Sequence, residues 1–330
     1  MIARTLSSLC LAVLGLLVLA GACPAAGLVP ATMLLQWRPQ AQFAGFYVAQ
    51  ERGFYREEGV NMTILPGGPE RLVVDYLTSG AATFGGMFLA RGVEVRANGA
   101  PVVNIAQIVQ RSSLMLVAKT ASGIRTVKDL AGRRVGLWGA EFGLQPKALF
   151  KREGIDPVVV AQGASLTLFL LGGVDACSAM WYNEYHTLMS AGLDVGELVP
   201  FFFHDLGLDF PEDGIYTLEQ TWNENPELCR AVARATLKGW RYAFDHPAEA
   251  LEIVLQQMER FHVPASRSHQ RWMLARMRDV IAPEGAAVDG ALGRKQYELV
   301  VRTLIEAGMI KAAPGFAAFF KGPTDERAGK

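Results

Sequence analysis

Strand-like and helix-like patterns alternate along the first two thirds of the chain. Each short apolar run is followed by a segment with helical spacing, and several of these helical segments end at glycine. This order is typical of open sheets whose parallel strands are joined by helices. The predicted strands are 32–37, 60–65, 82–84, 134–138, 158–161 and 175–180. The predicted helices are 42–52, 70–78, 144–153, 166–171 and 183–191.

From about residue 225 the pattern changes to consecutive helices. Asn225-Pro226-Glu227 places a capping residue, a first-turn proline and a first-turn acid in order, and His246-Pro247 opens the next helix in the same way. We expect these helices to return to the first sheet and cover it. The predicted fold is therefore α/β, with two open lobes joined by a hinge. Its parts are a signal peptide (1–26), lobe one (27–117 and 207–330) and lobe two (118–206), with crossing segments near 109–116 and 203–215.

The N-terminus has the pattern of an export signal. Arg4 supplies a positive charge, residues 9–20 are apolar, and Ala20-Gly21-Ala22 is a small-residue cleavage pattern. We expect a mature protein in the periplasm. A lipid anchor at Cys23 is the alternative, although Ala20 stands where a lipoprotein signal usually has leucine.

Charge and side-chain chemistry restrict the partners. Lys+Arg and Asp+Glu number 32 each in 330 residues, so the basic excess that nucleic acid selects is missing. We expect a monomer that binds a small molecule, without nucleic acid. The five histidines are scattered, so no metal or cofactor is expected. Cys177 and Cys229 are predicted to be free buried thiols, with a disulfide as the alternative.

Ligands of open parallel sheets lie beyond the carboxyl ends of the strands. Four predicted strand exits follow Trp37 or span 84–87, 138–142 and 181–184, and they combine aromatic rings with carboxylates. Each residue also has an ordinary structural explanation, such as a strand-end core ring, a tight turn, a helix cap or a first-turn acid. The predicted ligand-binding residues are Trp37, Phe43, Gly85, Gly86, Met87, Trp138, Glu141, Tyr182, Asn183, Glu184 and Tyr216.

Three segments resemble a known family. They are LLQWRPQAQFAGFYVA at 34–49 with RGFYREEGVNMTILPGG after it, LAGRRVGLWGAEF at 130–142, and DACSAMWYNEYHTL at 175–188. These segments are similar to solute-binding proteins of ABC importers related to thiamine-pyrimidine precursor receptors and yeast-type pyrimidine synthases. The resemblance implies the type II periplasmic-binding fold, closure of two lobes on a ligand, and delivery to an ABC permease.

The strand-exit residues indicate the ligand class. Carboxylate and amide acceptors suit a ligand with N–H donors, and aromatic faces suit a flat ring. We therefore expect a small nitrogen heterocycle such as a thiamine pyrimidine precursor, with Arg38 and Arg111 available for any phosphate on it. A receptor for sulfonate, taurine or nitrate is the alternative within the same fold.

Two readings other than transport stay open. The pyrimidine synthases that the chain resembles carry a histidine where this chain has Phe43, and a cysteine cluster where it has residues 210–214. These departures disfavour an enzyme. A sensory receptor of the same fold is the third reading.

Overall fold

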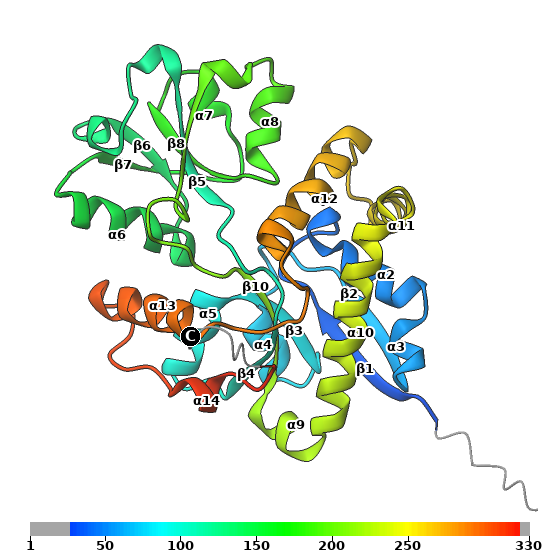
Figure 1. The fold of residues 1–330 in the computed structure, drawn as a ribbon. Coiled ribbons are helices and arrows are strands. Elements are labelled where there is room, and N and C mark those ends of the chain that lie inside the picture. Colours follow the sequence, from blue (N-terminus) through cyan, green and yellow to red (C-terminus); the bar gives the residue numbers. More distant parts are fainter. Residues whose placement is uncertain (1–26, 324–330) are drawn as a thin grey trace, which may run out of the picture.

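The computed structural model describes residues 27–323. The predicted signal peptide and Cys23 lie outside the described residues. Two five-stranded sheets form separate lobes, one below and one above in Figure 1. We call the lobe built on the sheet with strand order β2-β1-β3-β10-β4 lobe one, and the lobe built on β7-β6-β8-β5-β9 lobe two. Their residue bounds as given from sequence remain a prediction.

The strands of both sheets alternate with helices in the chain. Lobe one contains β1 (Val29–Leu34), β2 (Val60–Leu65), β3 (Phe84–Phe88), β4 (Val102–Gln107) and β10 (Asp213–Leu218). Lobe two contains β5 (Leu114–Lys119), β6 (Arg134–Leu137), β7 (Val158–Ala161), β8 (Ala176–Met180) and β9 (Leu198–Phe202). The α/β two-lobed fold that the sequence predicts is confirmed.

Two details of the sheets differ from the prediction. Both sheets are mixed, because β10 runs antiparallel to β3 and β4, and β5 runs antiparallel to β8 and β9. The segment 84–87, predicted as a strand-exit loop, is the body of β3 and is buried. A Cβ on Gly85 would lie 2.2 Å from Val73 Cγ1. The glycine therefore serves the close packing of α4 (Val73–Thr78) against the strand rather than a turn.

Helices cover both sheets. In Figure 1, α10 with α2 and α3 lies to the right of the first sheet, and α5 with α13 lies to its left. The helices of lobe one and its tail are α2 (Ala44–Glu51), α3 (Phe54–Glu57), α4 (Val73–Thr78), α5 (Leu89–Ala97), α9 (Glu219–Glu224), α10 (Pro226–Asp245), α11 (Pro247–Arg260), α12 (Arg267–Ile281), α13 (Arg294–Glu306) and α14 (Phe316–Phe319). Those of lobe two are α6 (Leu144–Glu153), α7 (Thr167–Leu170) and α8 (Glu184–Ser190). Short 3₁₀ turns are η1 (Ala41–Phe43), η2 (Thr120–Ser122), η3 (Val127–Leu130), η4 (Ala140–Gly143), η5 (Val195–Glu197) and η6 (Pro283–Gly285).

The two lobes are connected by two chain crossings that lie beside each other. One crossing follows β4 and the other precedes β10. The backbone N–H of Glu212 donates to the carbonyl of Val109 at 3.1 Å, and Val109 N–H donates to Asp213 O at 2.9 Å. Gln107 Nε2 donates to the carbonyls of both acids, at 3.0 and 3.2 Å. The crossings therefore form one hydrogen-bonded hinge.

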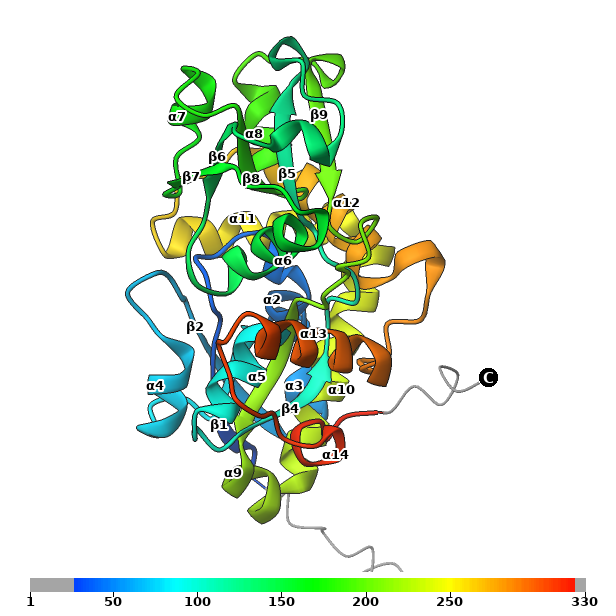
Figure 2. The ribbon, with the colours of Figure 1, turned by 90° about the vertical axis from the view of Figure 1, so that its left-hand side faces the viewer.

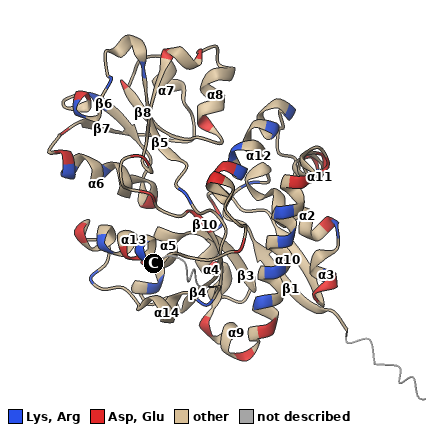
Figure 3. Cartoon of the chain, in the orientation of Figure 1, with Lys and Arg blue, Asp and Glu red and all other residues tan. Residues whose placement is uncertain are grey.

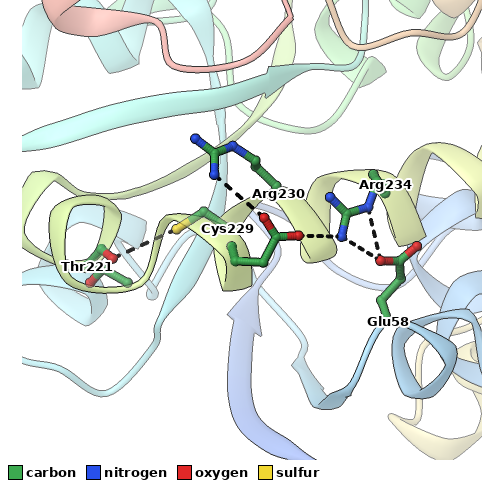
Figure 4. A network of polar contacts seen from close by, with 6 residues as sticks. Glu58, Thr221, Cys229, Arg230 and Arg234 are labelled. Carbon is green, nitrogen blue, oxygen red and sulfur yellow. Dashed lines mark hydrogen bonds and ion pairs between the residues drawn. The ribbon is translucent and has the colours of Figure 1, made fainter.

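The tail helices do return to lobe one, as predicted. α10 begins at Pro226 and packs against α2 and α3. On its surface, Arg234 donates to Glu58 at the end of α3 and to Glu227, which also pairs with Arg230 (Figure 4). Exposed pairs of this kind contribute little to stability. Packing of the buried face, with Trp240 fully buried, therefore holds α10 in place.

The α2–α10 contact is unusually close because both helices carry glycine there. A Cβ on Gly239 would lie 2.1 Å from the carbonyl oxygen of Gly45. A Cβ on Gly45 would lie 2.3 Å from the Trp240 ring. Any side chain larger than hydrogen must push the two helices apart.

We predict that Gly239→Ala destabilises the protein by about 1–3 kcal/mol, because overpacking forces the backbones to separate. Urea unfolding measures this change. Gly196→Ala is the control, since a Cβ there meets no atom within 4 Å. Equal stability of the two variants would contradict the close-packing account.

Candidate ligand-binding site

Glu212 binds one crossing segment to the other. It is 4% exposed, at the end of the second crossing. Its Oε1 accepts the backbone N–H groups of Ser113 at 2.6 Å and Leu114 at 3.2 Å, and the Ser112 hydroxyl lies 3.2 Å away. Its Oε2 has one partner, the Ser113 hydroxyl at 2.7 Å.

The Glu212 contacts suit a neutral acid. Burial raises the pKa of Glu212 to about 8, against the hydrogen bonds that lower it. The backbone N–H groups of Ser113 and Leu114, which can only donate, both contact Oε1. The Ser113 hydroxyl at Oε2 can rotate and accept a hydrogen bond instead of donating one. A proton on Oε2 therefore fits without losing a contact.

Asp213 follows Glu212 and accepts hydrogen bonds from two glutamines that follow β1 in the chain. Gln42 Nε2 donates to its Oδ2 at 2.7 Å, and Gln36 Nε2 donates to its Oδ1. Burial raises the pKa of Asp213 to about 7, although both amides lower it. Gln36 follows β1, so the strand exit and the hinge share one polar network.

The exit of β8 supplies the remaining polar groups. Glu184 begins α8, where its Oε2 accepts the Met180 backbone N–H at 3.0 Å and its Oε1 accepts Asn183 Nδ2 at 2.7 Å. Burial raises the pKa of Glu184 to about 7. Tyr182 is 4% exposed, and burial first, then the charges of Glu212, Asp213 and Glu184, raise the pKa of its hydroxyl well above the ordinary value. The β8 exit therefore faces the hinge.

These four residues, Tyr182, Glu184, Glu212 and Asp213, form what we call the acid cluster. Among residues 27–323, no lysine or arginine contributes to the pKa shifts of its three carboxyls. Both signs of charge are interspersed over the helices in Figure 3. Glu212 and Asp213, by contrast, are buried. A neutral carboxyl presents an O–H donor beside a carbonyl acceptor. Both oxygens of Glu212 are already held by the first crossing. Asp213 and Glu184 are therefore the carboxyls that can pair with a group offering N–H and ring nitrogen side by side, and the cluster as a whole opposes an anion.

Aromatic rings lie at the other strand exits. Trp37 is 36% exposed on the loop after β1. Trp138 donates its Nε1–H to Gly163 O at 3.0 Å, and its ring meets Phe142 edge-on at 5.7 Å. Phe142 in turn meets Phe88 of lobe one at 5.2 Å, so rings from both lobes are in contact.

A hollow of about 390 Å³ lies beside Trp37 on lobe one. Arg38, Arg71 and His262 line it, together with prolines and Phe261. Arg71 donates to Pro66 O at 2.6 Å. Arg111, the other arginine considered from sequence for a phosphate, instead pairs with Glu284 at 3.0 Å. Arg38 therefore lines a hollow, whereas the Arg111 guanidinium is engaged by a carboxylate.

The predicted site residues fall into two groups. Tyr182, Asn183 and Glu184 come together near the hinge, and the charges of Arg91 and Glu94 on α5 act across the lobes on Glu141, whose pKa burial raises. Apart from the strand-exit rings of Trp37 and Trp138, the others lie in lobe one: Phe43, Met87 and Tyr216 are buried in its core, and Gly85 and Gly86 are within β3. Tyr216 is fully buried, with its hydroxyl 3.2 Å from Asn104 Nδ2.

Comparison with known proteins gives the family. The model of the family described as NMT1/THI5 like matches residues 40–250. The chain belongs to the NMT1/THI5-like family. It is 29% identical to the 4-amino-5-hydroxymethyl-2-methylpyrimidine phosphate synthase of Legionella pneumophila, over 71% of this chain and 75% of that protein. It is 27% identical to the formylaminopyrimidine-binding protein of Halalkalibacterium halodurans, over 70% and 72% of the two chains.

Solved structures show the same fold. The periplasmic aliphatic sulphonate binding protein of Escherichia coli superposes with a TM-score of 0.68 at 15% identity, covering 90% of this chain and 93% of that one. The NMT1/THI5-like chain therefore has a periplasmic-binding-protein type II-like fold. The resemblance seen in the sequence is confirmed at the level of family and fold.

Several site residues were missed from the sequence. Glu212 and Asp213 were noted only as part of 210–214, although two adjacent acids just before a predicted crossing back to lobe one are a usable signal. Gln36, Gln42 and Ser113 carry no such signal, because their importance depends on contacts with distant residues.

Within residues 27–323, no three His, Cys, Asp or Glu side chains gather as metal ligands would. Over the same residues, no helix has the length and apolar character needed to cross a bilayer. Cys177 and Cys229 are both free and buried, as predicted.

We predict that the protein loses stability as pH rises from 6.5 to 8.5. The folded carboxyls hold their protons above the pKa of about 4.5 that unfolded glutamate has, so the folded state is favoured at the lower pH. That contribution disappears as pH passes the raised pKa values, by up to about 1.4 kcal/mol per pH unit for each group. Urea unfolding at several pH values measures the slope.

Glu212→Gln is the matched variant, since an amide can keep Oε1 as acceptor and donate to the Ser113 hydroxyl. Its stability should depend less on pH than that of the wild type. An unchanged slope would show that Glu212 is ionised throughout the range.

Proposed function

We propose that this protein is the extracytoplasmic binding component of an ABC importer, and that it captures a small flat nitrogen heterocycle such as a thiamine pyrimidine precursor. It binds this ligand between its lobes and does no chemistry on it. The ligand is handed to a permease in the cytoplasmic membrane.

The acid cluster carries this proposal. The buried carboxyls of Glu212 and Asp213, and the partly buried one of Glu184, have no cation among their partners, which favours a ligand that brings N–H donors or a positive charge. An aminopyrimidine offers an amino N–H beside a ring nitrogen, which matches the O–H and C=O of a neutral carboxyl. Trp37, exposed at the adjacent strand exit, supplies a face on which such a ring can stack.

The relatives support the same ligand class. One is named for binding formylaminopyrimidine, and another for making a pyrimidine phosphate. Both names point to a substituted pyrimidine, and one of the two proteins is a binding protein. The fold shared with the sulphonate-binding protein supports a two-lobed receptor without indicating its ligand.

A pyrimidine phosphate is a second candidate, favoured by one observation. Gln36 contacts the acid cluster, and Arg38, two residues later, lines the hollow with Arg71. Consecutive Cα atoms are about 3.8 Å apart, so Gln36 and Arg38 are close enough in the chain for one ligand to place its ring near the first and a side-arm phosphate near the second. A simple sulfonate or nitrate has no ring to stack on Trp37, and the carboxyls of the acid cluster would oppose its negative charge.

An enzyme that makes the pyrimidine is disfavoured by Phe43. Its ring is 1% exposed and packs against Phe46, so this position can neither donate nor accept a proton. No cysteine occurs in residues 210–214, which instead carry Glu212 and Asp213 of the hinge.

We predict that 4-amino-5-hydroxymethyl-2-methylpyrimidine or its phosphate raises the melting temperature, whereas alkyl sulfonates and nitrate do not. A ligand at a hundred times its Kd adds about 2.7 kcal/mol to the native state. For lobes of this size, each kcal/mol corresponds to about 2–4 °C. Thermal shift with this panel makes the measurement.

Trp37→Ala and Glu184→Gln should both reduce the shift. Trp37→Ala removes the indole face on which the ligand ring stacks, and Glu184→Gln changes the carboxyl that pairs with the polar edge of the ligand. Trp222→Ala is the control, since that half-buried ring lies on α9, away from the hinge. Stabilisation by sulfonate or nitrate alone would overturn the ligand class. An undiminished shift in Trp37→Ala would remove Trp37 from the site.

A further inference from the structure

Helix α12 of the tail contacts lobe two as well as lobe one. It packs against α8, and in Figures 1 and 2 it lies where the two lobes approach each other. Trp272 donates its Nε1–H to the carbonyl of Trp181 at 3.1 Å. The Arg276 guanidinium lies 4.8 Å from the centres of both indole rings. The tail helix thus makes a direct contact with the β8 exit.

A chain of hydrogen bonds runs from this helix to the acid cluster. His269 of α12 has its Nε2 2.8 Å from Asn183 Oδ1, and its Nδ1 2.9 Å from His186 Nδ1 on α8. Asn183 Nδ2 donates to Glu184 Oε1 at 2.7 Å. Because that amide nitrogen is used on Glu184, Oδ1 must accept, and His269 Nε2 must carry a hydrogen.

We propose that His269 is a positioning residue for the ligand-contacting edge of lobe two: lobe closure brings it onto Asn183, which fixes Asn183 and Glu184 for the ligand. This inference rests on the proposed function, because it assigns Glu184 to the ligand. It adds that the site is complete only when α12 and α8 meet. Helix α12, which belongs to the tail on lobe one, thus helps to orient Asn183 of lobe two.

The His186–His269 contact makes this closure sensitive to acid. In the neutral pair, His269 accepts at Nδ1 and His186 donates. One proton can be accommodated if His186 changes tautomer, but a second would place two N–H donors face to face across 2.9 Å. Burial lowers the pKa of both rings, and the charge of His186 lowers that of His269 further.

The groups around the pair do not neutralise it. Ser190 Oγ lies 3.3 Å from His186 Nδ1, and the Trp272 ring lies 5.2 Å from the His186 ring. Arg276, which shares that indole, pairs with Asp279 at 2.9 Å. Glu184 is reached only through Asn183. A doubly protonated pair must therefore separate, and the lobes open with it.

Small-angle scattering of protein refolded free of ligand tests the contact between the lobes. His269→Ala should increase the radius of gyration at pH 7.5, and wild type should increase it on going to pH 5.0. His269→Gln retains an N–H donor without a titrating ring, so it should remain closed at both pH values. Arg271→Ala, exposed on the same helix, is the control and should match wild type. An unchanged radius in His269→Ala at both pH values would overturn the proposal.

Calorimetric titration with 4-amino-5-hydroxymethyl-2-methylpyrimidine tests the positioning role. Loss of one hydrogen bond should weaken binding about two- to tenfold in His269→Ala, with recovery in His269→Gln. If wild type binds and His269→Ala binds equally well, His269 does not position the site. If wild type binds no pyrimidine, the proposed ligand is wrong, and scattering still decides the contact between the lobes.

Discussion

The fold depends on a buried glutamate at the point where the chain crosses twice between lobes. Two backbone N–H groups and two hydroxyls of Ser112, Ser113 and Leu114 surround the Glu212 carboxyl, although these residues lie about a hundred positions away in sequence. Sheet pairing ends there, so ordinary strand ladders cannot satisfy these groups. The Glu212 carboxyl therefore accepts the backbone N–H groups that a neighbouring strand would otherwise accept. Both lobes extend from that junction.

The proposed binding site lies at the same junction. Burying Glu212 and Asp213, and partly burying Glu184, without a cation opposes folding, and their raised pKa values follow from that burial. Natural chains retain such conflicts mainly where a ligand resolves them. Here the polar groups of both lobes meet at the hinge, and α12 adds a contact from lobe one to the β8 exit. In the proposed function, ligand capture and lobe closure thereby use the same residues.

Much of the fold could be predicted from sequence, because periodicity and caps are local. Strand 60–65 and helix 144–153 match β2 and α6 to the residue, and Pro226 begins α10 as expected. Gly85 misled because a glycine in a turn and one under a packed helix look alike in sequence. Tyr216 gave no sign that its ring points into the core. Glu212 and His269 gain their roles from partners about a hundred residues away in sequence, which no local pattern encodes.

The central claim is that the acid cluster holds an intact, neutral or cationic nitrogen heterocycle. Native mass spectrometry of the protein mixed with equal amounts of 4-amino-5-hydroxymethyl-2-methylpyrimidine, an alkyl sulfonate and nitrate tests it most directly. The account predicts one complex, with a mass equal to protein plus pyrimidine, that releases the pyrimidine chemically unchanged. A complex with sulfonate or nitrate, or release of a pyrimidine of altered mass, would contradict it.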